Sequence, residues 1–125
     1  MFSHVMIGTN DLQRSKAFYD AVLGTLGVGA PMMDGHRMFY MTPTGVLGVT
    51  EPINGEPACH ANGGTLGFAC ATSEQADAWH AAGVANGGVS CEEPPGVRDG
   101  GMGKMYLAYL RDPDGNKLCA LHRMG

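Results

Sequence analysis

The stretch of this chain that most clearly predicts local structure is Arg111-Asp112-Pro113-Asp114-Gly115-Asn116-Lys117. Aspartate, proline and glycine favour tight turns, so residues 112–115 predict a turn. The segments on either side of it, 104–110 and 117–122, are rich in aliphatic and aromatic side chains and read as strands. The stretch therefore predicts a β-hairpin close to the end of the sequence.

A shorter version of the same pattern occurs in the first half of the sequence. A shift of 70 positions lays Pro43-Thr44-Gly45 on Pro113-Asp114-Gly115, with strand-like segments 38–41 and 46–50 around it. A shift of 61 positions lays the strand-like segment 4–9 on 65–70 and Phe18 on Trp79. We therefore interpret the chain as two copies of a strand–helix–strand–strand–strand (βαβββ) module.

This repeat predicts the domain organisation. Module one spans about 1–52, a linker spans 53–63, and module two spans about 64–125. Neither module alone buries enough surface to be stable. The prediction is one α+β domain in which two paired βαβββ modules join into one curved mixed sheet that forms a cup.

Each module contains one predicted amphipathic helix. The first opens at Leu12, behind Asn10 and Asp11 as candidate N-caps. Its apolar side chains recur at spacings of three and four: Phe18, Tyr19, Val22, Leu23 and Leu26. The second helix is predicted over 74–86 with Ser73 as its N-cap. A loop rich in proline and glycine, 94–101, is expected to follow it and to act as a lid, with a mobile rim over 96–103.

Composition excludes several classes of protein. With 125 residues, 44% hydrophobic and 16% charged, the chain is expected to be a single globular domain. The net charge of −4 and the absence of a Lys/Arg cluster disfavour nucleic acid and membrane partners. No segment resembles a signal peptide, and the four cysteines contain no C-x-x-C pair, so we expect a cytoplasmic protein with reduced thiols.

The motifs together resemble the vicinal oxygen chelate superfamily, which includes glyoxalase I, bleomycin-resistance proteins and extradiol dioxygenases. The resemblance lies in three segments: His4-x-x-Ile7-x-Thr9-x-Asp11-Leu12-x-x-Ser15-x-x-Phe18-Tyr19, the strand ending in Phe68, and the closing Asp112–Asn116 turn. It covers nearly the whole chain. It implies a half-open cup built from βαβββ modules, often completed across a homodimer, with a small molecule as ligand.

The resemblance also implies where a divalent metal such as Zn, Ni or Mn would be held. His4 matches the ligand position of the first strand, whereas the equivalent positions elsewhere are Thr65, Cys119 and Val49. The standard metal site is therefore predicted to be altered or lost, and an iron dioxygenase is disfavoured. Glu51, two residues after Val49, would share its strand face, so His4, Glu51 and Cys119 form an alternative ligand set.

Other candidate site residues follow from residue type and position. His4 and Arg98 are the catalytic candidates, because a histidine titrates near neutral pH and a guanidinium suits an acidic ligand. Thr65, Tyr106 and His60 are candidate ligand-binding residues. The alternative without a functional role is that Arg98 and His60 are solvent-exposed loop residues. Tyr106 and Tyr109 are three residues apart in one strand, so only one of them is expected to line the cup.

Two functions remain open at this point. The first is a glyoxalase-like (lactoylglutathione-lyase-like) enzyme that acts on a small carbonyl or thiol-conjugated metabolite. The second is a metal-free protein that binds and sequesters a small molecule, as bleomycin-resistance relatives do. The missing ligands favour the second function mechanistically, whereas the broader family label favours the first.

Overall fold

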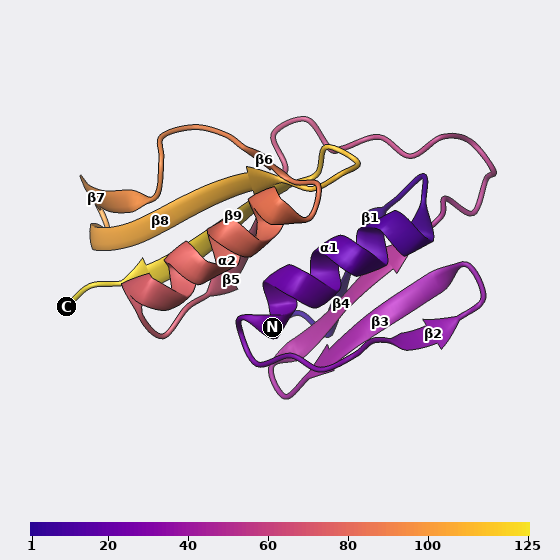
Figure 1. The fold of residues 1–125 in the computed structure, drawn as a ribbon, viewed down its shortest axis with the longest axis horizontal. Helices are drawn as coiled ribbons and strands as arrows, with labels where there is room; N and C mark the ends of the chain where they lie inside the picture. The colour runs from indigo at the N-terminus through magenta and orange to yellow at the C-terminus, as the bar shows by residue number, and fades with distance from the viewer.

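The computed structural model describes residues 1–125, which form two βαβββ modules lying side by side (Figure 1). Module one consists of β1 (His4–Gly8), α1 (Leu12–Gly24), β2 (Met32–Asp34), β3 (Arg37–Thr42) and β4 (Gly45–Thr50). Its strands form the first sheet, in the order β1-β4-β3-β2. Strands β1 and β4 are parallel, and the other neighbours are antiparallel.

Module two repeats this arrangement with one interruption. It consists of β5 (Leu66–Ala69), α2 (Ser73–Ala85), β6 (Val89–Ser90), β7 (Gly96–Gly100), β8 (Gly103–Arg111) and β9 (Lys117–Arg123). The second sheet has the order β5-β9-β8-β6, and β7 also pairs with β8. Strands β6 and β7 therefore share the place that β2 has in module one. The break between them contains Pro94 and Pro95, which have no N–H for a sheet hydrogen bond.

The α+β fold with two βαβββ modules is confirmed, with two differences from the expectation. Within one chain the two sheets stay separate, with β1 and β5 as the outermost strands of their sheets. The predicted lid at 94–101 is wrong for its second half, because Gly96–Gly100 forms β7 and pairs with β8 along its length. Helix α1 begins behind Asp11, whose side chain accepts from the Arg14 N–H, and α2 begins behind Thr72 instead of Ser73.

The hydrophobic core lies between the helices and one face of each sheet. Helices α1 and α2 pack against each other in front of the sheets (Figure 1). The fully buried side chains of the core include Phe18, Tyr19, Met38, Trp79 and Leu110. Gly83 of α2 allows this helix to pack closely on β8 and on α1, because a Cβ there would overlap Leu110 of β8 and lie 3.3 Å from Val22 of α1. No helix is long and apolar enough to cross a membrane.

The closing turn joins module two to module one. Asp114, whose side chain is 1% exposed, accepts hydrogen bonds from Thr9 Oγ1 (2.6 Å) and Ser15 Oγ (3.0 Å). It also accepts from the N–H of Asn10 (2.9 Å) and pairs with Arg14 (2.8 Å). All four donors lie at the junction of β1 and α1. One carboxylate therefore holds the last hairpin against the start of the chain.

Asp112 and Asn116 extend this junction. Asp112 accepts from the Tyr19 hydroxyl (2.6 Å), and from the N–H groups of Asp114 and Asn116, which closes the turn on itself (both 2.9 Å). Burial, followed by the charge of Asp112, raises the pKa of Tyr19 well above its usual value. The Asn116 amide donates to the carbonyl of Gly8 at the end of β1 (3.1 Å).

Asn116 also changes the alignment of the two modules. Leu47 pairs with Val5 as Leu118 pairs with Leu66, so β4 and β9 are related by a shift of 71 positions. The predicted shift of 70 was wrong by one residue, because the turn before β9 contains Asn116 and the turn before β4 has no counterpart to it. Gly48, and not Val49, is therefore equivalent to Cys119.

Candidate functional site

Each sheet has an open face, which we define as the face not covered by its helix. Cross-strand partners point to the same side, so the sheet register gives the residues of each face. On the first sheet the open face has three cross-strand rows: His4, Val46 and Met41; then Met6, Gly48 and Phe39; then Gly8, Thr50 and Arg37. An apolar middle row therefore separates a histidine row from an arginine row.

A pocket of about 390 Å³ lies over this open face. It is lined by His4, Met6, Arg37, Phe39, Thr50 and Ile53. The side chain of Met6 lies directly over Gly48, where a Cβ would overlap its sulfur and would lie 3.3 Å from the Phe39 ring. The glycine thus leaves room for a flat floor of thioether and aromatic groups. Such a floor suits an apolar ligand body.

Two polar side chains stand at the edge of this floor. His4 is exposed and lines the pocket; its Nδ1 lies 2.7 Å from Ser3 Oγ, and its Nε2 has no hydrogen-bond partner within the chain. Arg37 is half-buried and forms no ion pair. The pocket therefore offers one imidazole nitrogen and one unpaired cation around an apolar floor.

A second cavity, of about 490 Å³, lies between the two modules. Its walls come from the end of α1, the turn between β3 and β4, and strand β5, and His4 lines it as well. The apolar lining includes Leu23, Leu26, Val28, Leu47, Leu66 and Phe68. His4 therefore lies where two cavities meet, at the outer edge of β1.

The open face of the second sheet is more polar. It contains Cys119 and its cross-strand neighbour Tyr109. Lys117 pairs with Glu92, and its Nζ lies 5.1 Å from the centre of the Tyr109 ring. Cys119 is 6% exposed although it lies outside the main core. This burial raises the pKa of the Cys119 thiol, and nearby Glu92 raises it further.

The structure separates the predicted metal ligands. No three His, Cys, Asp or Glu side chains of the chain come together, so His4, Glu51 and Cys119 do not form a site within one chain. His4 and Cys119 lie on the open faces of different sheets. Val49 is fully buried in the core against α1. The face that Glu51 was expected to share with it is therefore the helix-covered one, which corrects that prediction.

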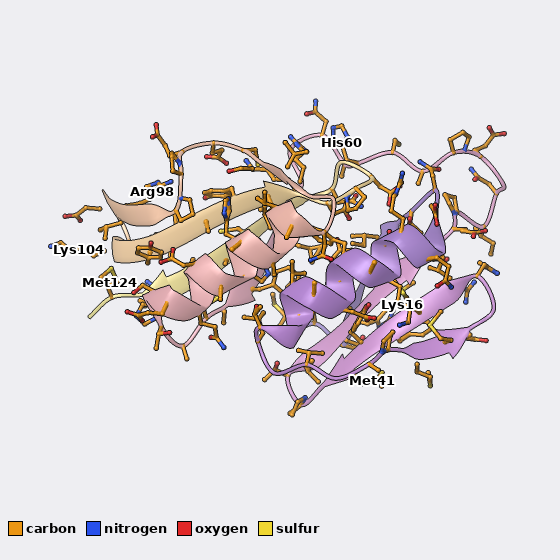
Figure 2. The ribbon with its side chains drawn as sticks, in the orientation of Figure 1. Lys16, Met41, His60, Arg98, Lys104 and Met124 are labelled. Carbon is orange, nitrogen blue, oxygen red and sulfur yellow. The ribbon has the colours of Figure 1, made fainter.

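The other predicted residues are distributed over both modules. Tyr106 donates to Asp77 of α2 (2.6 Å) and so lies on the helix-covered face. Tyr109, and not Tyr106, lies on the open face of the second sheet. Thr65 is exposed immediately before β5. Figure 2 shows Arg98 beside β7 and His60 in the linker, well apart from each other. The Arg98 guanidinium donates to the carbonyl of Pro94 (2.9 Å), and His60 lines neither cavity.

Of the six pocket residues the sequence analysis identified only His4, and it missed the other five: Met6, Arg37, Phe39, Thr50 and Ile53. A signal for two of them was present, because Arg37 and Phe39 alternate with buried Met38 and Tyr40 along one strand. Alternation shows which side chains share a face but not which face a helix covers.

A family model and several solved structures match this chain. A family model described as Glyoxalase/Bleomycin resistance protein/Dioxygenase superfamily matches residues 1–120. The crystal structure of a glyoxalase/bleomycin resistance protein from Albidiferax ferrireducens T118 is 67% identical, with a TM-score of 0.96. That match covers 98% of this chain and 99% of the other. No protein of curated function matches.

More distant structures share the fold alone. A glyoxalase-related enzyme from Fulvimarina pelagi is 20% identical, with a TM-score of 0.76, over 98% of this chain and 88% of that one. A lactoylglutathione lyase from Agrobacterium tumefaciens is 21% identical, with a TM-score of 0.67, over 98% and 92% of the two chains.

Proposed function

Because the chain belongs to the Glyoxalase/Bleomycin resistance protein/Dioxygenase superfamily, we propose that it binds a small molecule on its open sheet faces without using a metal ion. The observation that carries this proposal is the pocket over Met6 and Phe39, whose volume of about 390 Å³ suits a small ligand. Its apolar floor would hold the body of the ligand. The few polar groups at its edge would fix the orientation of the ligand.

A homodimer would complete the cup. Strands β1 and β5 are each the last strand of a sheet and have no neighbour on the outer side. Such edges are ready to pair with another strand. If two chains pair β1 with the partner's β5, the first sheet of one chain continues into the second sheet of the other, and the two-fold operation makes two equal cups. His4 and the partner's Cys119 would then line one cup.

The residues at the metal positions of the family do not fit Zn, Ni or Mn. After the alignment is corrected, these positions are His4, Gly48, Thr65 and Cys119. Gly48 offers no side-chain donor and lies beneath Met6. Thr65 offers only a neutral hydroxyl, and Cys119 lies on the open face of the second sheet, apart from His4 on the first. No step of the function is therefore assigned to a metal.

A second candidate is a metal-independent enzyme with His4 as its general base. The free Nε2 of His4, held in place through Nδ1 and Ser3, favours it. A histidine in that position could move a proton on a small carbonyl or thiol-conjugated metabolite. The lyase activity named for the Agrobacterium protein belongs to that protein. We also propose a cytoplasmic location, because Cys59 is an exposed thiol, which an oxidising compartment would modify.

The test uses the neutral fluorophore phenylnaphthylamine as a probe of the apolar floor. We expect saturable binding that is unchanged by EDTA and is lost in Met6→Glu, which puts a charge on the floor. Val84→Glu is the matched control, because Val84 is an exposed apolar residue of α2, 49% accessible. Absence of saturable binding to the wild-type protein would contradict the proposal.

Metal dependence and catalysis are measured on the same preparation. We expect no isomerisation of the hemithioacetal of methylglyoxal and glutathione, with or without added Ni or Zn. Isomerase activity that appears with either metal would overturn metal independence. Activity that persists in EDTA and is lost in His4→Ala would select the second candidate instead.

A further inference from the structure

Arg37 differs from every other arginine in the chain. Arg14 pairs with Asp114 (2.8 Å), and Arg98, Arg111 and Arg123 each donate to a backbone carbonyl, of Pro94, Gly115 and Met102 respectively. Arg37 has no ion pair, although it is half-buried and lines the pocket. Its five N–H donors are therefore available to a ligand.

No carboxylate lies within ion-pair distance of Arg37. Its cross-strand neighbour on β2 is Asp34, which is exposed and forms no ion pair with it. On the other side it pairs with Thr50, whose hydroxyl already donates to the carbonyl of Glu51 (2.7 Å). No carboxylate lines the pocket. Apart from His4, the guanidinium is thus the only ionisable group of the pocket.

The apolar floor begins one row away from Arg37. Phe39 is two residues further along β3, about 7 Å at the usual strand rise, and Met6 lies across Gly48 from it. Ile53 lines the same pocket. A ligand with an anionic group at one end and an apolar body of about one or two rings would contact both regions at once.

We propose that the pocket selects organic acids: an oxyanion group, such as a carboxylate or a sulfonate, binds the Arg37 guanidinium while the apolar body of the ligand lies on Met6 and Phe39. This inference rests on the proposed function and specifies the ligand class of the same site. A guanidinium fork holds a carboxylate through two parallel hydrogen bonds, which a lysine ammonium does not reproduce.

Two probes with the same ring skeleton test the inference. Anilinonaphthalene sulfonate carries an anionic group, and phenylnaphthylamine is its neutral counterpart. We expect the wild-type protein to bind the sulfonate more tightly, and we expect added salt to weaken only the sulfonate complex. Arg37→Gln should weaken sulfonate binding by about tenfold or more, because a hydrogen bond to a charged group is lost, and should leave phenylnaphthylamine binding unchanged. Arg37→Lys should give an intermediate result.

Lys104→Gln is the matched control for loss of one positive charge. Lys104 is exposed and unpaired, and it lies at the far end of module two (Figure 2). Equal affinity for both probes, or an unchanged sulfonate affinity in Arg37→Gln, would overturn the inference and leave the proposed function intact. Failure of phenylnaphthylamine itself to bind would instead overturn the proposed function. If Arg37→Gln does not fold, the probe preference and salt dependence of the wild-type protein decide the question.

Discussion

Asp114 joins the two modules through one carboxylate that accepts from four donors. We expect Asp114→Ala to lower the free energy of unfolding by about 3 kcal/mol, because it leaves buried hydroxyls and Arg14 without their partner. Urea denaturation followed by tryptophan fluorescence measures the change, since Trp79 is fully buried. Asp34→Ala, at an exposed and unpaired aspartate, is the control. A loss for Asp114→Ala no larger than that of the control would contradict this account.

The thiols provide a second prediction at the scale of single residues. Burial raises the pKa of Cys119 and of Cys70, so both have less thiolate at neutral pH than an ordinary cysteine. Cys59 is exposed. We expect iodoacetamide to modify Cys59 first and Cys119 at least about tenfold more slowly, with the rate at Cys119 rising as the pH becomes alkaline. Peptide mass spectrometry gives each rate. Rapid modification of Cys119 at neutral pH would contradict this account of a buried thiol.

The sequence predicted some single-residue roles and missed others for a physical reason. His4 was correctly placed on the first strand. Arg37 was not identified, because the feature that distinguishes it is the absence of an ion-pair partner. Whether a guanidinium has a carboxylate within reach depends on side-chain positions across three strands, which a linear pattern does not contain.

At the scale of elements, helices α1 and α2 meet at Gly83. We expect Gly83→Ala to destabilise the protein by about 1 kcal/mol, because overpacking against buried Leu110 exceeds the gain in helix propensity. Gly24→Ala is a matched control within α1, since nothing lies within 4 Å of a Cβ there. That change should be neutral or slightly stabilising. Thermal unfolding of both variants measures the difference, and a stabilised Gly83→Ala would show that Leu110 and Val22 can make room for a Cβ without cost.

Both helices were predicted within a residue or two, because capping residues and three-and-four spacing are local signals. Strand β7 was predicted as a mobile rim because it contains glycines and follows two prolines. Its pairing with β8 comes from the partner strand and not from its own composition. The register of β4 was wrong by one because only the second turn contains Asn116.

At the scale of the whole molecule, the unpaired edges of β1 and β5 predict a dimer. We expect sedimentation equilibrium to give twice the chain mass of 13.1 kDa. Phenylnaphthylamine binding should weaken as dilution dissociates the dimer, because each cup would need both chains. A protein that remains monomeric at high concentration and binds the probe fully would contradict the shared cup.

From the sequence repeat we predicted two modules, and we expected their sheets to form one continuous sheet within a single chain. The repeat shows that the modules are alike, and it does not show which of their edges or faces meet. In the structure the helices meet and the edges of the sheets stay apart. This arrangement of the modules depends on burying α1 against α2. The role of the small residue Gly83 in this packing can be recognised only when its neighbours Val22 and Leu110 are known.

The contacts of the closing turn can form only late in translation. The hydrogen bond from Thr9 to Asp114 spans 105 positions along the chain. During synthesis the residues of module one leave the ribosome long before their last partner exists. Until then Thr9, Ser15 and Tyr19 have no carboxylate to bind, so the junction is completed only when the final hairpin emerges. Chaperone capture of the nascent chain should therefore end only after the last turn has been translated.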